Sequence, residues 1–341
     1  SYSVIRVWFG KITLMNNPIC HKCGTITHYH GKQDNGKKRY YCNNKECPVI
    51  TFNEDYGTGY YNMKLDKKDV DEVIYLFFTG YPISEMVGLK NVTEQCIRDT
   101  LSKAIVHFER FEEFKINYEG YIPEVIEIDE IYLNVQGSKE FYGWIAYDPK
   151  NKFIIHVELG KRDEETLKNL FSRLKKYRGK TKLVLVDALR SYEGLIKKYL
   201  SKNGHFPKVG VLNKSKYMKE QQGFLTYGLF GVGRTSIEEL MQEYGIGNKI
   251  STALIECLNK LIRDDSPYLK RRSARKGRGL KWILKSLKGI RFFRNLCKPH
   301  WRLSFRSSKN WLKIKITPLM EIGITDHILS IREKLSTKIP H

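Results

Sequence analysis

The sequence predicts a mixed α/β fold for its larger second part, and two observations support this prediction. Three strand-like stretches come first, and a turn at 148–152 makes the last two antiparallel neighbours. Helix and strand patterns then alternate, which is typical of a sheet covered by helices. The expected strands are residues 125–133, 142–147, 153–159, 182–187 and 208–212, and the expected helices are residues 163–177 and 192–200. In such sheets, sites form at the strand ends.

The composition indicates a basic protein with a polyanionic partner. The chain has 341 residues, enough for two or three domains, and its 60 Lys and Arg against 37 Asp and Glu give a net charge of +23. This excess favours nucleic acid over the alternative, a generally basic surface. No apolar run approaches the roughly 20 residues that span a bilayer, so no membrane partner is expected. Arg6 and Lys11 interrupt the N-terminal stretch, which therefore does not read as a signal peptide.

Four of the seven cysteines lie before residue 50, in two closely spaced pairs. Each pair closes a short loop whose two sulfurs can bind one ion, and four thiolates suit a single tetrahedral Zn²⁺. Between the pairs, Asp34-Asn35-Gly36 is a hairpin-turn signal, so the segment is predicted to be a zinc ribbon. The expected ligands are Cys20, Cys23, Cys42 and Cys47. His21, His28 and His30 are possible substitutes that we assign to loops.

Residues 66–107 carry the pattern of three helices separated by tight turns. Asp66 and Thr93 stand where the N-caps of the first and third helices are expected. A short helix followed by a tight turn and a longer helix is typical of a helix-turn-helix domain, whose third helix would enter the major groove. The outward residues expected to reach DNA are Gln95, Arg98 and Lys103, beside Glu94. The alternative is a plain helical linker between domains.

Acidic residues stand at the ends of two expected strands and on a later helix. Asp129 lies in the first strand, and Asp187 ends the fourth. A buried carboxylate is costly unless it is paired, so these acids indicate either a cage for divalent metal ions or ordinary salt bridges. Helix 251–263 has an acidic, a polar and a basic residue on one face, namely Glu256, Asn259 and Arg263. The basic run at 270–278 suits phosphate contact, or else a solvated loop.

Several longer motifs follow one another in a fixed order. They are Ile128-Asp129-Glu130-Ile131-Tyr132, Gly143-Trp144-Ile145-Ala146-Tyr147-Asp148, Gly160-Lys161-Arg162-Asp163-Glu164-Glu165-Thr166, Val186-Asp187-Ala188-Leu189-Arg190-Ser191-Tyr192, Ile255-Glu256-Cys257-Leu258-Asn259-Lys260-Leu261-Ile262-Arg263, Asn295-Leu296-Cys297-Lys298-Pro299-His300-Trp301-Arg302-Leu303 and Thr317-Pro318-Leu319-Met320-Glu321-Ile322-Gly323-Ile324-Thr325. Together they resemble insertion-sequence transposases of the DDE class, which have a ribonuclease-H-like, integrase-type core. The resemblance implies a zinc ribbon at 1–60, a helix-turn-helix domain at 61–117 and a catalytic domain at 118–335 with an insertion at 213–250.

The resemblance also implies roles for individual residues. The implied catalytic acids, which would bind two Mg²⁺ ions (Mn²⁺ is a substitute), are Asp129, Asp187 and Glu256. The residues expected to contact DNA are Asn259, Arg263, Lys270, Arg271, Arg272 and Arg275. Because the gap before Glu256 is long, Glu238 and Glu239 stay rival third acids. Glu130 points to the opposite face of its strand and is not assigned to metal.

The implied function is DNA transposition. Such an enzyme binds the terminal inverted repeats of its element as duplex DNA, hydrolyses the phosphodiester at each end and joins the 3′-hydroxyl to target DNA by two-metal-ion catalysis. Synapsis of two ends implies a homodimer or a larger assembly, and the expected location is the nucleoid in the cytoplasm of a prokaryotic cell. Two alternatives stay open: a transposase-derived, site-specific DNA-binding protein without catalysis, and a ribonuclease-H-like nuclease that cuts without joining.

Overall fold

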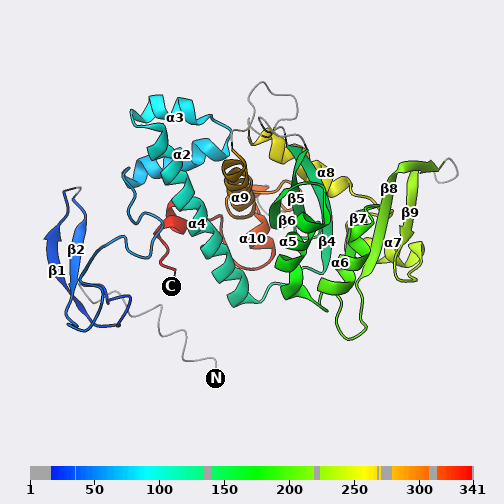
Figure 1. Cartoon of the computed structure of the whole chain (residues 1–341), viewed down its shortest axis with the longest axis horizontal. Coiled ribbons are helices and arrows are strands. Elements are labelled where there is room, and N and C mark those ends of the chain that lie inside the picture. Colours follow the sequence, from blue (N-terminus) through cyan, green and yellow to red (C-terminus); the bar gives the residue numbers. More distant parts are fainter. Residues whose placement is uncertain are drawn as a thin grey trace. The chain divides into compact units, whose positions relative to one another are not determined.

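The computed structural model describes residues 17–34, 36–133, 135, 140–218, 223–266, 269, 279–306 and 313–339. The chain divides into two compact units, Ser1–Met63 with Leu335–His341 and Lys64–Lys334, and each is described by itself. Figure 1 labels their helices and strands. None of the described helices contains an apolar stretch of the length that crossing a bilayer requires.

The smaller unit contains a three-stranded antiparallel sheet within its described residues, in the order β1-β2-β3. The strands are β1 (Thr27–Lys32), β2 (Lys38–Cys42) and β3 (Thr51–Asn53). Strands β1 and β2 pair across the expected hairpin turn, of which Asn35 lies outside the described residues. The assignment of His28 and His30 to loops is wrong, because both lie in β1. This edge strand is exposed along most of its length, so polar side chains are tolerated there.

Three helices begin the larger unit, at the places that the sequence predicts. They are α2 (Lys67–Phe78), α3 (Ile83–Lys90) and α4 (Glu94–Glu119). Asp66 caps α2 by accepting a hydrogen bond from the Asp69 amide at 2.8 Å, and Thr93 caps α4 through the Cys96 amide at 3.2 Å. The predicted helix starts are therefore confirmed, whereas α4 continues well beyond its predicted end at His107.

Six strands of the described chain form one mixed sheet, in the order β6-β5-β4-β7-β8-β9. They are β4 (Val125–Leu133), β5 (Phe141–Asp148), β6 (Phe153–Gly160), β7 (Leu183–Asp187), β8 (Lys208–Met218) and β9 (Gly223–Gly228). Strands β4, β5 and β6 are antiparallel neighbours, while β7 pairs with β4, and β8 with β7, in parallel. The predicted mixed α/β sheet is confirmed, and it is compatible with a ribonuclease-H-like fold.

The segment 213–247 has a place in the sheet, contrary to our expectation that it lacks one. Strand β8 continues to Met218, and β9 pairs with it as an antiparallel edge strand. One glycine in each of these strands serves close packing. A Cβ at Gly228 would lie 2.1 Å from the Val232 carbonyl oxygen, and a Cβ at Gly210 would lie 2.9 Å from Leu185. The helix α7 (Arg234–Glu243) follows this strand.

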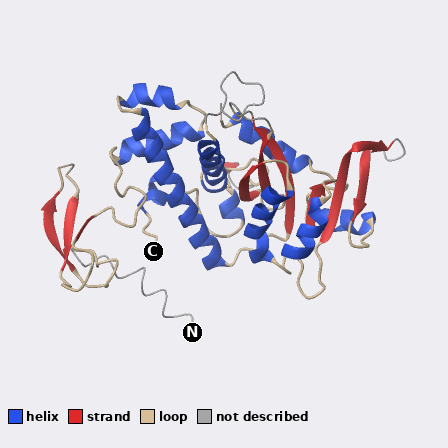
Figure 2. Cartoon of the chain, in the orientation of Figure 1, coloured by secondary structure: helices blue, strands red, loops and turns tan. Residues whose placement is uncertain are grey.

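Helices cover both faces of the sheet (Figure 2). On one face, α7, α8 (Ala253–Asp264) and α9 (Leu280–Leu296) pack apolar residues against β4, β5, β6 and β7. The strand residues that point the other way, such as Ile128 and Trp144, are also buried, and α5 (Glu164–Leu174) packs there against β5, β6 and α6 (Ser191–Tyr199). Because both faces are covered, the strands read as continuous apolar runs. The short elements are the 3₁₀ helix η2 (Lys175–Tyr177), β10 (Phe305–Arg306), β11 (Lys313–Ile314), α10 (Pro318–Glu321) and α11 (Ile331–Ser336).

A buried polar network joins the long helix α4 to the sheet. The Arg291 guanidinium on α9 donates to the Glu112 carboxylate on α4, and the Asn295 amide donates to the same carboxylate at 2.9 Å. Arg291 Nε and Asn295 Nδ2 also donate to the carbonyl oxygen of Ile154 on β6, at 3.1 and 2.9 Å. Glu112 and Asn295 have no exposed surface. This network fixes α4, α9 and β6 relative to one another.

Candidate active site

The two strand acids lie side by side. In the parallel pairing of β4 with β7, Glu127 is opposite Leu185. Continuing this register by two residues sets Asp187 opposite Asp129, on strands about 4.8 Å apart. Asp129 is 7% exposed and the Asp187 side chain 13% exposed. The two acids lie on neighbouring strands as expected, but Asp129 is in the middle of β4, and only Asp187 ends its strand.

The helix α8 brings the third acid and its polar neighbour to the same face. Asn259 Nδ2 donates to Asp129 Oδ2 at 3.1 Å, and Thr252 Oγ1 donates to Glu256 Oε1 at 2.9 Å. Glu256 and Asn259 are three residues apart, so their side chains share one side of the helix, as the spacing predicted. Arg263 lies in the last turn of the same helix.

Lys214 on β8 is a cation within this group, and the sequence reasoning missed it. Its ammonium lies 2.6 Å from Glu256 Oε1. Burial alone would lower the pKa of Lys214, but the hydrogen bond to Glu256 and the charges of Asp129 and Asp187 raise it. Lys214 could have been found only by recognising that β8 continues past Leu212.

Burial, together with the negative charges of Asp187 and Glu256, raises the pKa of Asp129 to about 6, against the opposing effect of Lys214. Asp187 and Glu256 therefore both lie within electrostatic reach of Asp129. A nearby cation would stabilise the ionised form of a carboxylate that burial and like charges disfavour in this way. This crowding of negative charge makes the site suited to divalent metal ions.

Arg162 contacts Asp187, the acid of β7, together with Glu130. Its guanidinium donates to Asp187 Oδ2 at 3.0 Å and lies 2.9 Å from Glu130 Oε1. Burial, and after it the charge of Asp187, raises the pKa of Glu130 to about 7. Arg162 follows β6 directly within the Gly160–Thr166 motif, and that position was the signal that could have identified it.

Glu127 is a further acid that the sequence reasoning did not single out. It lies two residues before Asp129, on the same face of β4, and is 1% exposed. Burial raises its pKa to about 8, and the backbone amide of Ile255 on α8 offsets this only in part. The alternation of side chains along a strand was the signal for it, since residues i and i+2 share a face.

The donor set fits Mg²⁺, although the acids do not surround one point in this structure. Among the described residues, only the four cysteines bring three or more Cys, His, Asp or Glu ligand atoms within 4.8 Å of one another. Lys214 and Arg162 occupy carboxylate oxygens of Glu256 and Asp187 instead. The buried Oδ1 of Asn259, beside Asp129, has no hydrogen-bond partner among the described residues. Carboxylates and an amide oxygen are the ligands that hard cations prefer.

The rival third acids lie elsewhere on α7. Glu238 Oε1 is 2.8 Å from Arg234 Nε, an ion pair within its own helix, and Glu239 is exposed. Glu256 instead borders a hollow of 490 Å³ together with Lys214, Arg234 and Lys249. Three cations around a carboxylate form a surface that suits a DNA backbone.

The residues predicted to contact DNA have different surroundings. Arg98 donates to Glu94 Oε1 at 2.6 Å and lies 4.7 Å over the Trp282 ring, while Gln95 donates to Asp99 at 2.7 Å. Lys103 is exposed on α4. The basic residues Lys270, Arg271, Arg272 and Arg275 lie outside the described residues.

The four predicted zinc ligands form a separate cluster in the smaller unit. The Cys20 and Cys47 sulfurs are 3.7 Å apart, and those of Cys23 and Cys42 are 3.5 Å apart. A tetrahedron with Zn–S bonds of about 2.3 Å has sulfur–sulfur edges of about 3.8 Å. The cluster is therefore compatible with a zinc site. His21 stacks on Tyr56 with ring centroids 3.6 Å apart and is not part of it.

Removing zinc is expected to unfold the smaller unit. Its sheet is small, and the metal would link the two cysteine pairs on either side of the β1–β2 hairpin. The variant Cys20→Ser should purify with far less zinc, measured by elemental analysis, and should lose the near-ultraviolet circular dichroism of the tyrosines in this unit. Cys257→Ser is the matched control, since this exposed thiol lies on α8 outside the cluster. Equal zinc contents in the two variants would contradict a four-cysteine site.

Comparisons with known proteins give a limited result. No protein-family model and no curated protein matches the chain. The catalytic domain of Mos1 mariner transposase is similar at 12% identity and a TM-score of 0.20, over 56% of this chain and 90% of that one. The Mos1 transposase paired-end complex with left transposon end has 9% identity and a TM-score of 0.18, over 67% and 77%. Such scores establish neither fold nor function.

A third solved structure, the Mos1 transposase catalytic domain with Raltegravir and Mg, is similar at 10% identity and a TM-score of 0.18, over 55% of this chain and 90% of that one. The functional conclusion therefore depends on this chain's own residues. Its fold and sites define a mixed α/β protein with an acidic group on two adjacent strands of its sheet and on α8, and with a separate four-cysteine cluster.

Proposed function

We propose that the chain is a DNA transposase of the DDE class. The observation that supports the proposal is that Asp129 and Asp187 lie on adjacent parallel strands and that α8, which carries Glu256, contacts Asp129 through Asn259. Their order along the chain and the net charge of +23 support a nucleic-acid substrate. The substrate would be duplex DNA carrying the terminal repeats of the element, and the products would be cut ends joined to target DNA.

The surrounding side chains orient the acids. Asn259 holds Asp129, Thr252 holds Glu256 and Arg162 holds Asp187, each by the hydrogen bond given above. Two Mg²⁺ ions, when bound by the three acids, supply an activated nucleophile and stabilise the leaving oxygen. The cationic wall around Glu256 would hold the DNA backbone against the acids.

The remaining parts would recognise and pair the ends. The four-cysteine unit and the helices α2 to α4 would bind the terminal repeat as a zinc ribbon and a helix-turn-helix domain. The basic run at 270–278 would contact phosphates. Because two ends are joined in one event, the active form would be a homodimer or a larger assembly.

A strand-transfer assay tests the proposal. Purified protein is incubated with Mg²⁺ and a labelled duplex that carries the end of the element. Wild type should give cut and joined products, and Asp129→Asn and Asp187→Asn should give neither while still binding the duplex. Binding without cutting or joining in Mg²⁺ or Mn²⁺ would favour the non-catalytic DNA-binding alternative. Cutting without joining would favour a nuclease.

Replacing Lys214 by Met is expected to raise the affinity of the acidic site for Mn²⁺ about fivefold, since solvent screens a pair whose side chains are 39% and 50% exposed and leaves it worth about 1 kcal/mol. The ammonium now pairs with Glu256, and a metal ion must displace it. Calorimetric titration with Mn²⁺ measures the change. Lys249→Met is the control, because Lys249 borders the same hollow but makes no described ion pair with an acid. An unchanged or weaker affinity in Lys214→Met would be inconsistent with this competition.

A further inference from the structure

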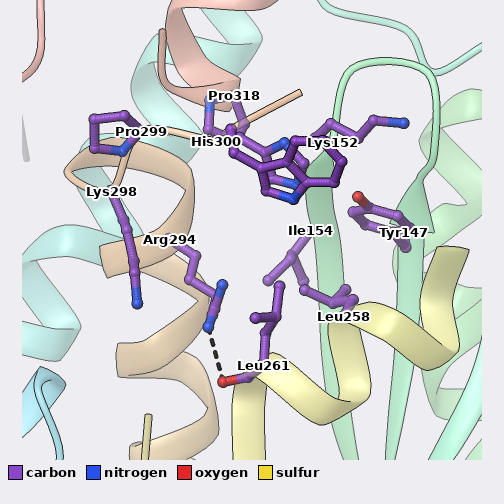
Figure 3. A pocket seen from close by; sticks show the side chains of 11 residues that line it. Tyr147, Lys152, Ile154, Leu258, Leu261, Arg294, Lys298, Pro299, His300 and Pro318 are labelled. Carbon is purple, nitrogen blue, oxygen red and sulfur yellow. Dashed lines mark hydrogen bonds between the residues drawn. The ribbon is translucent and has the colours of Figure 1, made fainter. Parts of the chain in front are cut away.

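A second hollow, of 130 Å³, lies between the sheet and the segment after α9 (Figure 3). Its floor and walls are apolar and aromatic, formed by Tyr147, Ile154, Leu258, Pro299, His300 and Trp301. Figure 3 shows Tyr147, His300 and Leu258 gathered around it, with Arg294 below. A cavity of about 150 Å³ admits one benzene ring. The hollow therefore has the size for one six-membered ring.

Trp301 is the unusual feature of this hollow. Its side chain is 65% exposed, although burying a tryptophan contributes strongly to stability. The His300 ring is nearly parallel to it, at an interplanar angle of 17°, and the Arg302 guanidinium lies 4.9 Å over its centroid. An exposed aromatic face beside cations is how proteins hold unpaired bases.

The charges around the hollow are positive. Lys152 is 9% exposed and donates to the Pro149 carbonyl, and no described carboxylate lies within ion-pair distance of it. Arg294 and Lys298 share a single carboxylate, Asp265, at 2.6 and 2.9 Å. The charged residues that line the hollow are therefore all cations, which suits a ligand with one ring and a phosphate.

His300 adds a directed hydrogen-bond donor. Burial, and the charges of Lys152, Arg294 and Arg302, lower the pKa of His300 to about 4, so the ring is neutral near pH 7. Its Nδ1 accepts from the backbone amide of Arg302 at 3.2 Å, which leaves the proton on Nε2. A protonated Nε2 can donate to a carbonyl oxygen of a base.

We propose that this hollow binds one unpaired pyrimidine nucleotide of the DNA, with the base against Trp301 and its phosphate against the basic rim. The position suits this role, because α8 carries both the lining residues Leu258 and Leu261 and the site residues Glu256 and Asn259. Tyr147 pairs with Glu127, two residues or about 7 Å along β4 from Asp129. The inference rests on the proposed DNA-processing function.

Fluorescence anisotropy with two labelled probes tests it, without Mg²⁺. One probe is a short oligothymidine, and the other is an abasic strand of the same length. Trp301→Ala should weaken oligothymidine binding about tenfold, the loss expected for one stacked base, and leave abasic binding unchanged. Trp301→Phe should keep most of the affinity. Phe206→Ala, which removes an exposed ring elsewhere, should have no effect on either probe.

The outcomes separate this inference from the proposed function. Equal losses on both probes, or none, would overturn the base site even if wild type cuts and joins DNA. Effective competition by thymidine monophosphate at equal concentration would overturn the assignment to a DNA strand. Both probes are read without Mg²⁺, so a failure of catalysis does not affect this readout.

Discussion

Glu256→Gln is expected to lower DNA cleavage and strand transfer by about 10³-fold, the scale of losing one preorganised electrostatic group. The amide keeps the shape of the side chain and can still accept from Thr252, but it removes the negative charge. That charge now attracts Lys214 and opposes ionisation of Asp129. Without it the site would bind metal ions more weakly. Product formation in Mg²⁺ and Mn²⁺ affinity by calorimetry measure the two effects.

Matched variants on α7 decide which acid is the third. Glu238→Gln removes a carboxylate that is paired with Arg234 in its own helix, and Glu239→Gln removes an exposed one. Both should cut and join DNA within about twofold of wild type, as surface substitutions usually leave a fold unchanged. If Glu238→Gln or Glu239→Gln lost activity and Glu256→Gln kept it, the assignment of Glu256 would be wrong.

Glu112→Ala is expected to destabilise the larger unit by about 3–5 kcal/mol, because it leaves Arg291 buried without its carboxylate. Burial raises the pKa of Glu112, and Arg291 and Asn295 offset this shift only in part. Burying the Glu112–Arg291 pair therefore costs free energy, and removing one partner costs still more. Since the network joins α4, α9 and β6, a loss there should lower the melting temperature by roughly 10 °C.

The control for this variant lies one turn earlier on the same helix. Glu109 pairs with Lys288 at 2.8 Å, and both side chains are about a quarter exposed. Glu109→Ala should cost less than about 1 kcal/mol, since solvent screens such a pair. Calorimetry of both variants gives the comparison. Similar melting temperatures for the two would mean that the buried network does not hold the unit together.

The local patterns of the sequence predicted much of this fold. The spacing of Val70, Val73 and Ile74 is helical, and Asp66 and Thr93 are caps whose hydrogen bonds are made as expected. The apolar runs of β4 and β7 predicted strands buried on both faces. Helix starts and buried strands depend on residues that are close in sequence, so periodicity and capping residues reveal them.

The predictions that proved wrong concern segments whose conformation depends on tertiary packing. The glycines of β9 lower strand propensity, but Gly228 admits Ile237 of α7 at close range, so the strand pattern of 213–228 was not visible. The histidines of β1 lie in a strand because its edge is solvated. The end of α4 was placed too early, because the part that follows is held by α9 through Glu112.

The sequence by itself determined the element types, the mixed sheet, the cysteine pairs and the acids on two strands, because each follows from local spacing and side-chain chemistry. Only the tertiary structure decided which cations accompany the acids. Lys214 and Arg162 reach Glu256 and Asp187 from other elements, and no local pattern encodes such contacts. The hollow beside Trp301 likewise depends on β5, β6, α8 and the segment after α9 meeting in space. Burial and charge pairing between distant residues are properties of the folded chain, so they appear only there.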